Sequence, residues 1–230
     1  MLHGSIDFLT VDADLDGKLE IFATDHYGHL QAFRHDGSKA GAFYTSIGDM
    51  QATLADLDGD GRVEMIYGSS TGDLLSTKLP ETGSWQRGAK TLWRFDNFGY
   101  GVNRLRSADL DVDGDAEIVV ASQTGYLYVL DGRGRVKWQD RAGTDIVEAL
   151  VLADAEPRLA YFDRSGVLTL ATGDGEVRRR IALDRVPTVA MQLGDKIVVG
   201  TGSELLSFEI GGLWKSGSAT SVTTRRPGPG

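Results

Sequence analysis

The stretch ADLDVDGDAEIVVASQTG, residues 108–125, contains the pattern that decides the fold of this chain. It combines an acidic loop, a run of aliphatic residues and a glycine that ends the run. ADLDGDGRVEMIYGSSTG, residues 55–72, repeats the pattern, and VDADLDGKLEIFATDHYG, residues 11–28, repeats it less closely. A short apolar run that ends in a glycine turn is typical of a β-hairpin, because glycine readily adopts the positive φ of tight turns.

Five strand-like runs of this kind occur along the chain. Each begins with an aliphatic residue or methionine, called the anchor below: Ile21, Met65, Ile118, Leu159 and Ile197. A leucine follows nine residues later in the first four units and eight residues later in the fifth: Leu30, Leu74, Leu127, Leu168 and Leu205. Each unit also has an extended segment before the anchor and another after the leucine. Four strands in about 40–50 residues are typical of a β-propeller blade.

The repeat therefore predicts an all-β fold, a β-propeller of about five four-stranded blades. The expected blades cover residues 6–48, 49–100, 101–145, 146–184 and 185–216, within a propeller domain of residues 1–216. Residues 217–230 are rich in Gly, Ser, Thr, Pro and Arg, which predicts a flexible tail or linker. The alternative is part of a larger propeller, completed by another chain or by further sequence.

Composition excludes several function classes. The chain has 24 basic and 33 acidic residues, a formal net charge of -9, whereas a nucleic-acid binder needs a basic face. No apolar run reaches the roughly 18 residues of a membrane-spanning helix. The absence of cysteine removes disulfides, thiolate metal sites and thiol nucleophiles.

The same acidic spacing precedes the first three anchors. Carboxylates stand at positions 1, 3, 5 and 9 of each loop: Asp12, Asp14, Asp16 and Glu20; Asp56, Asp58, Asp60 and Glu64; Asp109, Asp111, Asp113 and Glu117. Position 6 is glycine, which permits a sharp bend, and the backbone carbonyls at position 7 belong to Lys18, Arg62 and Asp115. Hard oxygen ligands in this number favour Ca²⁺ over zinc or copper. The loops predict about three structural calcium ions.

These loops are not EF-hands. An EF-hand needs a bidentate glutamate at position 12, where this chain has Ala23, Tyr67 and Val120. Here the acid at position 9 runs directly into a predicted strand instead. The fourth and fifth units lack the ligand set, so no metal site is expected there.

The three stretches resemble FG-GAP repeats, the calcium-binding blades related to VCBS repeats and found in the integrin α-subunit propeller. The resemblance covers residues from about 6 to 140, whereas GYLYVLDGRGRVKW, residues 125–138, and the later units look more like quinoprotein-type blades. It implies a structural calcium ion and a role in adhesion, in assembly, or in binding a protein or glycan. It also implies an extracellular, cell-surface or periplasmic location, although no signal peptide is visible in this chain.

An enzyme remains the alternative to a non-enzymatic binding module. The motif Gly68-Ser-Ser-Thr-Gly72 satisfies the G-x-S-x-G pattern, but it lies in a predicted hairpin turn and every histidine precedes it. We therefore assign no catalytic residue. A propeller enzyme such as a calcium-dependent polysaccharide lyase or a quinoprotein-like dehydrogenase would have Arg104, Arg106 and Glu148 as inner-strand candidates.

Overall fold

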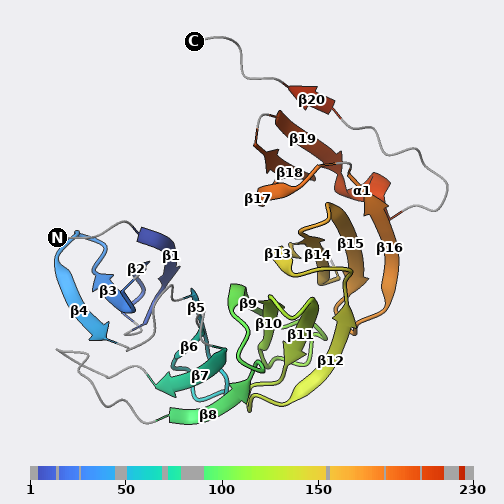
Figure 1. Cartoon of the computed structure of the whole chain (residues 1–230). Coiled ribbons are helices and arrows are strands. Elements are labelled where there is room, and N and C mark those ends of the chain that lie inside the picture. Colours follow the sequence, from blue (N-terminus) through green and yellow to red (C-terminus); the bar gives the residue numbers. More distant parts are fainter. Residues whose placement is uncertain are drawn as a thin grey trace.

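The structure of the chain consists of five sheets of four antiparallel strands that follow one another as blades 1 to 5 (Figure 1). It is a computed structural model that describes residues 5–13, 16–25, 27–44, 51–68, 72–78, 91–153, 156–183, 185–202, 204–214 and 223–225. Within each blade the strands lie in chain order from the inner edge to the outer edge. This architecture confirms the predicted all-β propeller of five four-stranded blades.

The blades have the following strands. Blade 1 contains β1 (Ser5–Val11), β2 (Glu20–Asp25), β3 (His29–Phe33) and β4 (Lys39–Tyr44). Blade 2 contains β5 (Gln51–Ala55), β6 (Glu64–Gly68), β7 (Asp73–Lys78) and β8 (Thr91–Asp96). Blade 3 contains β9 (Val102–Ala108), β10 (Glu117–Ser122), β11 (Tyr126–Leu130) and β12 (Val136–Arg141). Blade 4 contains β13 (Ile146–Leu152), β14 (Arg158–Asp163), β15 (Val167–Thr172) and β16 (Val177–Ala182). Blade 5 contains β17 (Pro187–Leu193), β18 (Lys196–Thr201), β19 (Glu204–Glu209) and β20 (Thr223–Arg225).

The outer strand of blade 5 lies later in the chain than the sequence led us to expect. The residues after β19 form a short helix, α1 (Ile210–Leu213), and β20 then pairs with β19 from within the stretch expected to be a tail. Gly211 and Gly212 have little tendency to form a strand, whereas Thr223 and Thr224 are β-branched. The free edge of β19 therefore takes its fourth strand from the threonine segment.

Helical structure is minor in the described ranges. The helix α1 has only 4 residues. None of the helical residues described forms a segment of the length and apolar character that crossing a bilayer requires.

Neighbouring blades are held together by alternate side chains of their second strands. In blades 2 to 5 the anchor faces the preceding blade, and in blades 1 to 4 the next residue faces the following blade. Met65, the anchor of blade 2, is fully buried against Phe22 and Leu30 of blade 1. Its neighbour Ile66 is buried against the anchor Ile118 of blade 3. The same relation recurs between blades 3 and 4 and between blades 4 and 5. The period-2 alternation of a strand thus builds every junction between blades.

Outer-strand tryptophans connect two of these junctions at the rim. The indole Nε1 of Trp93 in blade 2 donates a hydrogen bond of 2.9 Å to the carbonyl of Gly132 in blade 3. Trp138 of blade 3 donates a bond of 2.9 Å to the carbonyl of Gly173 in blade 4. The two side chains therefore connect neighbouring blades.

The five blades form an open arc in Figure 1, with blade 1 at one end and blade 5 at the other. Burial shows which faces are uncovered. The anchor of blade 1, Ile21, is 41% exposed, whereas the other four anchors are at most 1% exposed. At the far end Leu205 is 52% exposed, whereas the equivalent leucine of each preceding blade is fully buried. The first face of blade 1 and the last face of blade 5 are therefore exposed, whereas the corresponding faces of the other blades are covered by a neighbouring blade.

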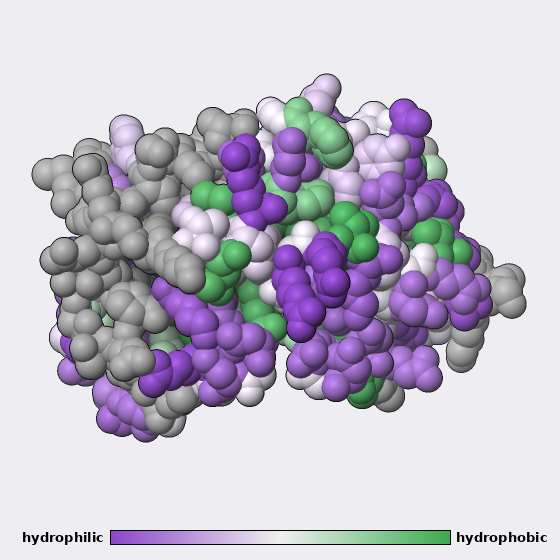
Figure 2. Space-filling model, turned by 90° about the horizontal axis from the view of Figure 1, so that it is seen from below, coloured by the Kyte–Doolittle hydropathy of each residue, from purple (hydrophilic) through white to green (hydrophobic). Residues whose placement is uncertain are grey.

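The outer edge of the arc is largely polar. Strands β8, β12 and β16 alternate between exposed and partly buried residues. Figure 2 views the arc from below, and hydrophilic residues predominate on that face, with hydrophobic ones in small separate groups. Alternation of this kind is expected of a strand with one solvated face.

The difference in burial between Leu168 and Leu205 predicts that their alanine variants lose different amounts of stability. Leu168→Ala should lower the free energy of unfolding by about 2–5 kcal/mol, because it opens a cavity between blades 4 and 5. Leu205→Ala, at the equivalent position of blade 5, should cost less than about 1 kcal/mol, since its side chain is half exposed. Urea unfolding of both variants measures the difference, and equal losses would show that blade 5 is covered in solution.

Candidate metal sites

The three acidic loops occupy equivalent places in blades 1, 2 and 3. Each loop connects the inner strand of its blade to the second strand: β1 to β2, β5 to β6, and β9 to β10. The acid at position 9 is the first residue of the second strand in every case, as Glu20, Glu64 and Glu117. The loops therefore lie at the same end of three consecutive blades.

The aspartate at position 1 organises its loop through backbone hydrogen bonds. Asp56 accepts the N–H of Gly59 at 2.8 Å on one carboxylate oxygen and the N–H of Gly61 at 2.8 Å on the other. Asp12 and Asp109 each accept two bonds in the same way, from the N–H groups at positions 5 and 6. Gly61 has a φ of 81°, the left-handed conformation in which glycine is favoured.

The glutamate at position 9 has one oxygen bound and one oxygen directed at the loop. Oε2 of Glu64 accepts the N–H of Leu57 at 2.9 Å. Glu20 and Glu117 use Oε2 in the same way toward the residue at position 2. The other oxygen of Glu64, Oε1, is buried and has no hydrogen-bond partner. Burial raises the pKa of the Glu64 carboxyl, the Leu57 N–H opposes the shift, and the nearby Asp58 charge adds to it.

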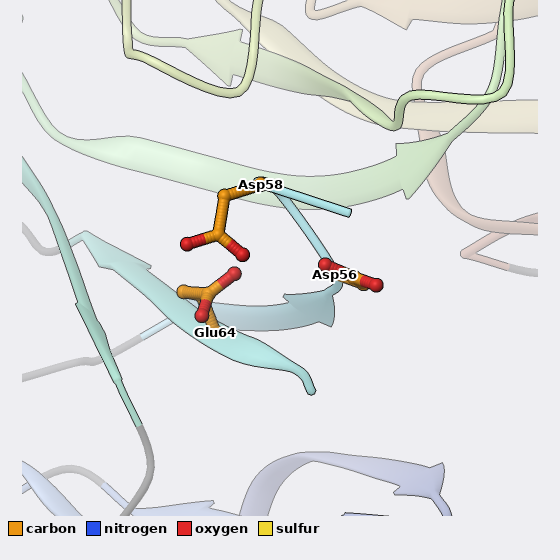
Figure 3. A group of neighbouring side chains, drawn as sticks. All are labelled: Asp56, Asp58 and Glu64. Atoms are coloured by element: carbon orange, nitrogen blue, oxygen red, sulfur yellow. The ribbon is translucent and has the colours of Figure 1, made fainter. Parts of the chain in front are cut away.

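The carboxylates at positions 1, 3 and 9 form a compact group in two of the loops. Oxygens of Asp56, Asp58 and Glu64 all lie within 4.8 Å of one another, and Figure 3 shows Asp58 and Glu64 turned toward each other. Asp109, Asp111 and Glu117 form the corresponding group in blade 3. Such a group offers several oxygen donors to one cation.

The remaining predicted ligands are placed differently. The carboxylates at position 5, Asp60 and Asp113, are not members of these compact groups. In the first loop Asp14 lies outside the described residues, while Asp16 accepts the N–H of Lys18 at 2.8 Å. For the carbonyls of Lys18, Arg62 and Asp115, the role of calcium ligand stays a prediction.

A lysine ammonium lies inside each of the two groups. Nζ of Lys78 is 3.0 Å from Oδ2 of Asp58, 2.6 Å from Oδ2 of Asp60 and 3.5 Å from Oε1 of Glu64. The hydrogen bond to Asp60 is the largest cause of the raised pKa of Lys78, and that bond lowers the pKa of Asp60.

The second ammonium belongs to blade 3. Nζ of Lys137 is 2.5 Å from Oδ2 of Asp111 and 2.9 Å from Oε1 of Glu117. The hydrogen bond to Lys137 lowers the pKa of Asp111. Sequence reasoning missed both lysines. For Lys78 a signal existed, because it pairs directly with Glu64 in the β6–β7 register.

A cavity of about 670 Å³ lies between the second and third loops. Acidic and basic residues from both blades line it, among them Asp58, Glu64, Glu117, Arg133 and Lys137. Three carboxylates of the two compact groups, Asp58, Glu64 and Glu117, therefore border a space that a ligand can reach.

The inner-strand candidates form an ion-pair cluster between blades 3 and 4. Nε of Arg104 is 3.0 Å from Oε2 of Glu148, and Nη2 of Arg106 is 3.3 Å from Oε1 of the same carboxylate. Glu148 is buried, and it has both arginines as partners. The cluster therefore joins two blades.

Comparison with family models identifies the repeat. A model of FG-GAP-like repeats matches residues 12–67, which contain the first two acidic loops. A model described as the lambda-carrageenase β-propeller domain matches residues 84–156, which contain the third loop. The chain is a β-propeller of five blades, and residues 12–67 of it match FG-GAP-like repeats. Comparison with curated protein sequences found none that matches this propeller.

Solved structures similar to this chain share its propeller fold. BBS1N, solved in complex with ARL6DN, has a TM-score of 0.71 at 13% identity over 96% of this chain and 68% of that one. Sqt1 of Saccharomyces cerevisiae has a TM-score of 0.68 at 12% identity, over 90% of this chain and 60% of that one. BamB of Moraxella catarrhalis has a TM-score of 0.58 at 14% identity, over 90% of this chain and 61% of that one. The chain thus spans about 60–68% of the length of these proteins.

The aspartate at position 1 holds the loop backbone, so we expect Asp56 to contribute more than Asp58 to the free energy of unfolding when no metal is bound. Asp56→Ala should lower the free energy of unfolding in chelator by about 1–2 kcal/mol, because two loop N–H groups lose their acceptor. Asp58→Ala should change it by no more than about 0.5 kcal/mol, since its ion pair with Lys78 is largely exposed. Chemical denaturation of both variants in chelator provides the measurement. A larger loss for Asp58→Ala would contradict this assignment.

Proposed function

We propose that this protein is a calcium-stabilised β-propeller that binds a macromolecular partner as a non-enzymatic interaction or assembly module. The observation that carries the calcium part is the buried oxygen Oε1 of Glu64, which has no hydrogen bond and lies 3.5 Å from the Lys78 ammonium, in a group with two further carboxylates. A buried acceptor without a hydrogen bond is costly, and a bound cation satisfies it.

The chemistry of the donors fits calcium. All members of the two compact groups are carboxylates, and Ca²⁺ takes six to eight oxygen ligands, whereas zinc and copper prefer nitrogen or sulfur. The lysine ammonium found in each group is a second indication that a positive charge belongs there. When bound, calcium would supply two positive charges that neutralise the group and brace the loop. The equivalent backbone bonds of the first loop extend the proposal to about three structural ions.

The interaction role draws its support from the repeat and the fold. FG-GAP-like repeats match residues 12–67, in blade 1 and the first half of blade 2, and the similar BBS1N structure was solved in complex with a protein, ARL6DN. We therefore place a protein first among the partners. The match to a lambda-carrageenase β-propeller domain favours a glycan as the second candidate.

The proposed location follows from calcium affinity. Calcium sites of extracellular modules often have dissociation constants of about 10⁻⁴–10⁻³ M, and such sites would stay empty in a low-calcium cytosol. An extracellular, cell-surface or periplasmic location would keep these loops loaded. Adhesion is the corresponding role at a cell surface.

Calcium should raise the stability of the full chain. With dissociation constants in the range above, about 10 mM calcium should add about 1.4–2.7 kcal/mol per site, or about 3–10 °C in the melting midpoint. Thermal unfolding in calcium, magnesium and chelator measures the effect. Glu64→Gln should lose the gain of the second loop while it keeps the volume of the side chain. An identical midpoint in calcium and in chelator would refute the calcium proposal.

Binding of the partner should require calcium in the acidic loops. Affinity capture from extract of the source organism, in millimolar calcium and again in chelator, should retain a protein only in calcium. The double variant Glu64→Gln and Glu117→Gln is the matched control, and it should lose that protein in both buffers. Retention of a glycan instead would favour the second candidate. Failure to retain any specific ligand would contradict the interaction role.

A further inference from the structure

The lysines of the second and third loops reach their carboxylate groups from different parts of the blade. Lys78 is on β7, where it lies opposite Glu64 in the strand register. Lys137 is on β12, the outer strand, and it crosses β11 to reach Glu117. The two residues therefore do not occupy one repeated position. Both nevertheless place Nζ between the acid at position 3 and the glutamate at position 9.

The oxygens that hold the ammonium are among those a metal ion would need. In blade 3 Lys137 contacts Oδ2 of Asp111 and Oε1 of Glu117, while Oε2 of Glu117 is already bound to the N–H of Leu110. In blade 2 Lys78 approaches Oε1 of Glu64, the oxygen without a hydrogen-bond donor. A lysine ammonium and a calcium ion cannot share these oxygens at their own contact distances, because like charges repel at close range.

We propose that Lys78 and Lys137 are built-in competitors for calcium in the second and third loops. In the metal-free protein each ammonium neutralises its carboxylate group, and calcium enters as the ammonium leaves. This inference rests on the proposed calcium function and adds to it. The lysines weaken calcium binding, and in the metal-free protein they reduce the repulsion between the carboxylates of each loop.

The side chains of Lys78 and Lys137 can move from the carboxylate groups into solvent. Their side chains are 43% and 32% exposed, so each stem already borders solvent. Lysine carries a compact charge on a flexible four-carbon stem, and a strongly hydrated ammonium loses little when it turns into water. The acids, in contrast, are fixed by the backbone bonds of Leu57 and Leu110. Exchange of lysine for calcium therefore needs one side-chain movement and no change in the blade.

The test is a calcium titration of the full chain by calorimetry. Lys137→Met and Lys78→Met keep an apolar stem and remove the charge, so each should raise the calcium affinity of its own loop about five- to tenfold. In chelator both variants should melt at a lower temperature than the wild type, because the carboxylates lose their counter-charge. Lys137→Arg retains a positive charge and should bind calcium about as weakly as the wild type.

Lys196→Met is the matched control, since Lys196 pairs with Glu209 in blade 5, 3.0 Å away and outside the acidic loops. It should leave the calcium affinity unchanged. If the wild type binds calcium and both loop variants bind it equally or more weakly, the competitor role is wrong and the calcium function stands. If no form of the protein binds calcium, the proposed calcium function fails and this inference fails with it.

Discussion

Face-to-face packing of neighbouring blades is the constraint on which the rest of this structure depends. The inner strands of blades 2, 3 and 4 bury both of their faces, one against the blade before and one against the blade after. The strand alternation of Met65 and Ile66 satisfies this requirement in two residues. The buried anchors and leucines contribute to the apolar burial between blades, at roughly 25 cal/mol per Å² of apolar surface removed from water.

Blade packing also determines what the acidic loops can do. Since the second strand is held on both faces, the glutamate at its first residue has little freedom to move. Its Oε2 is bound to the backbone and its Oε1 points into the loop, so the carboxylate group is preorganised around a site for positive charge. A flexible loop would separate its carboxylates to relieve their repulsion. Here the strand position of the glutamate and the backbone bonds of the position-1 aspartate restrict that separation, and a nearby positive charge lowers the energy.

Much of the fold could be predicted because it is periodic in the sequence. The anchors, the leucines and the turn glycines recur at nearly constant spacing, and each corresponds to one local conformation. Positions 1, 3 and 9 of the loops could be predicted as a group for the same reason. Lys137 could not, because its place depends on how β12 pairs across β11, which is a long-range contact. The fourth strand of blade 5 was also missed, since 13 residues of the chain lie between the end of β19 at Glu209 and the start of β20 at Thr223.

The tryptophan–glycine contacts at the rim have a consequence for how such a protein can be rearranged. The indole of Trp93 lies so close to Gly134 that a Cβ there would be 2.6 Å from the ring, and Trp138 leaves 2.7 Å above Gly175. Each contact thus packs a tryptophan ring of one blade against a glycine of the next blade. A blade is therefore not a self-sufficient module for recombination. Replacement of a blade by one that lacks the matching tryptophan or glycine would remove one half of a contact, so only transfers that supply both halves keep the blade spacing.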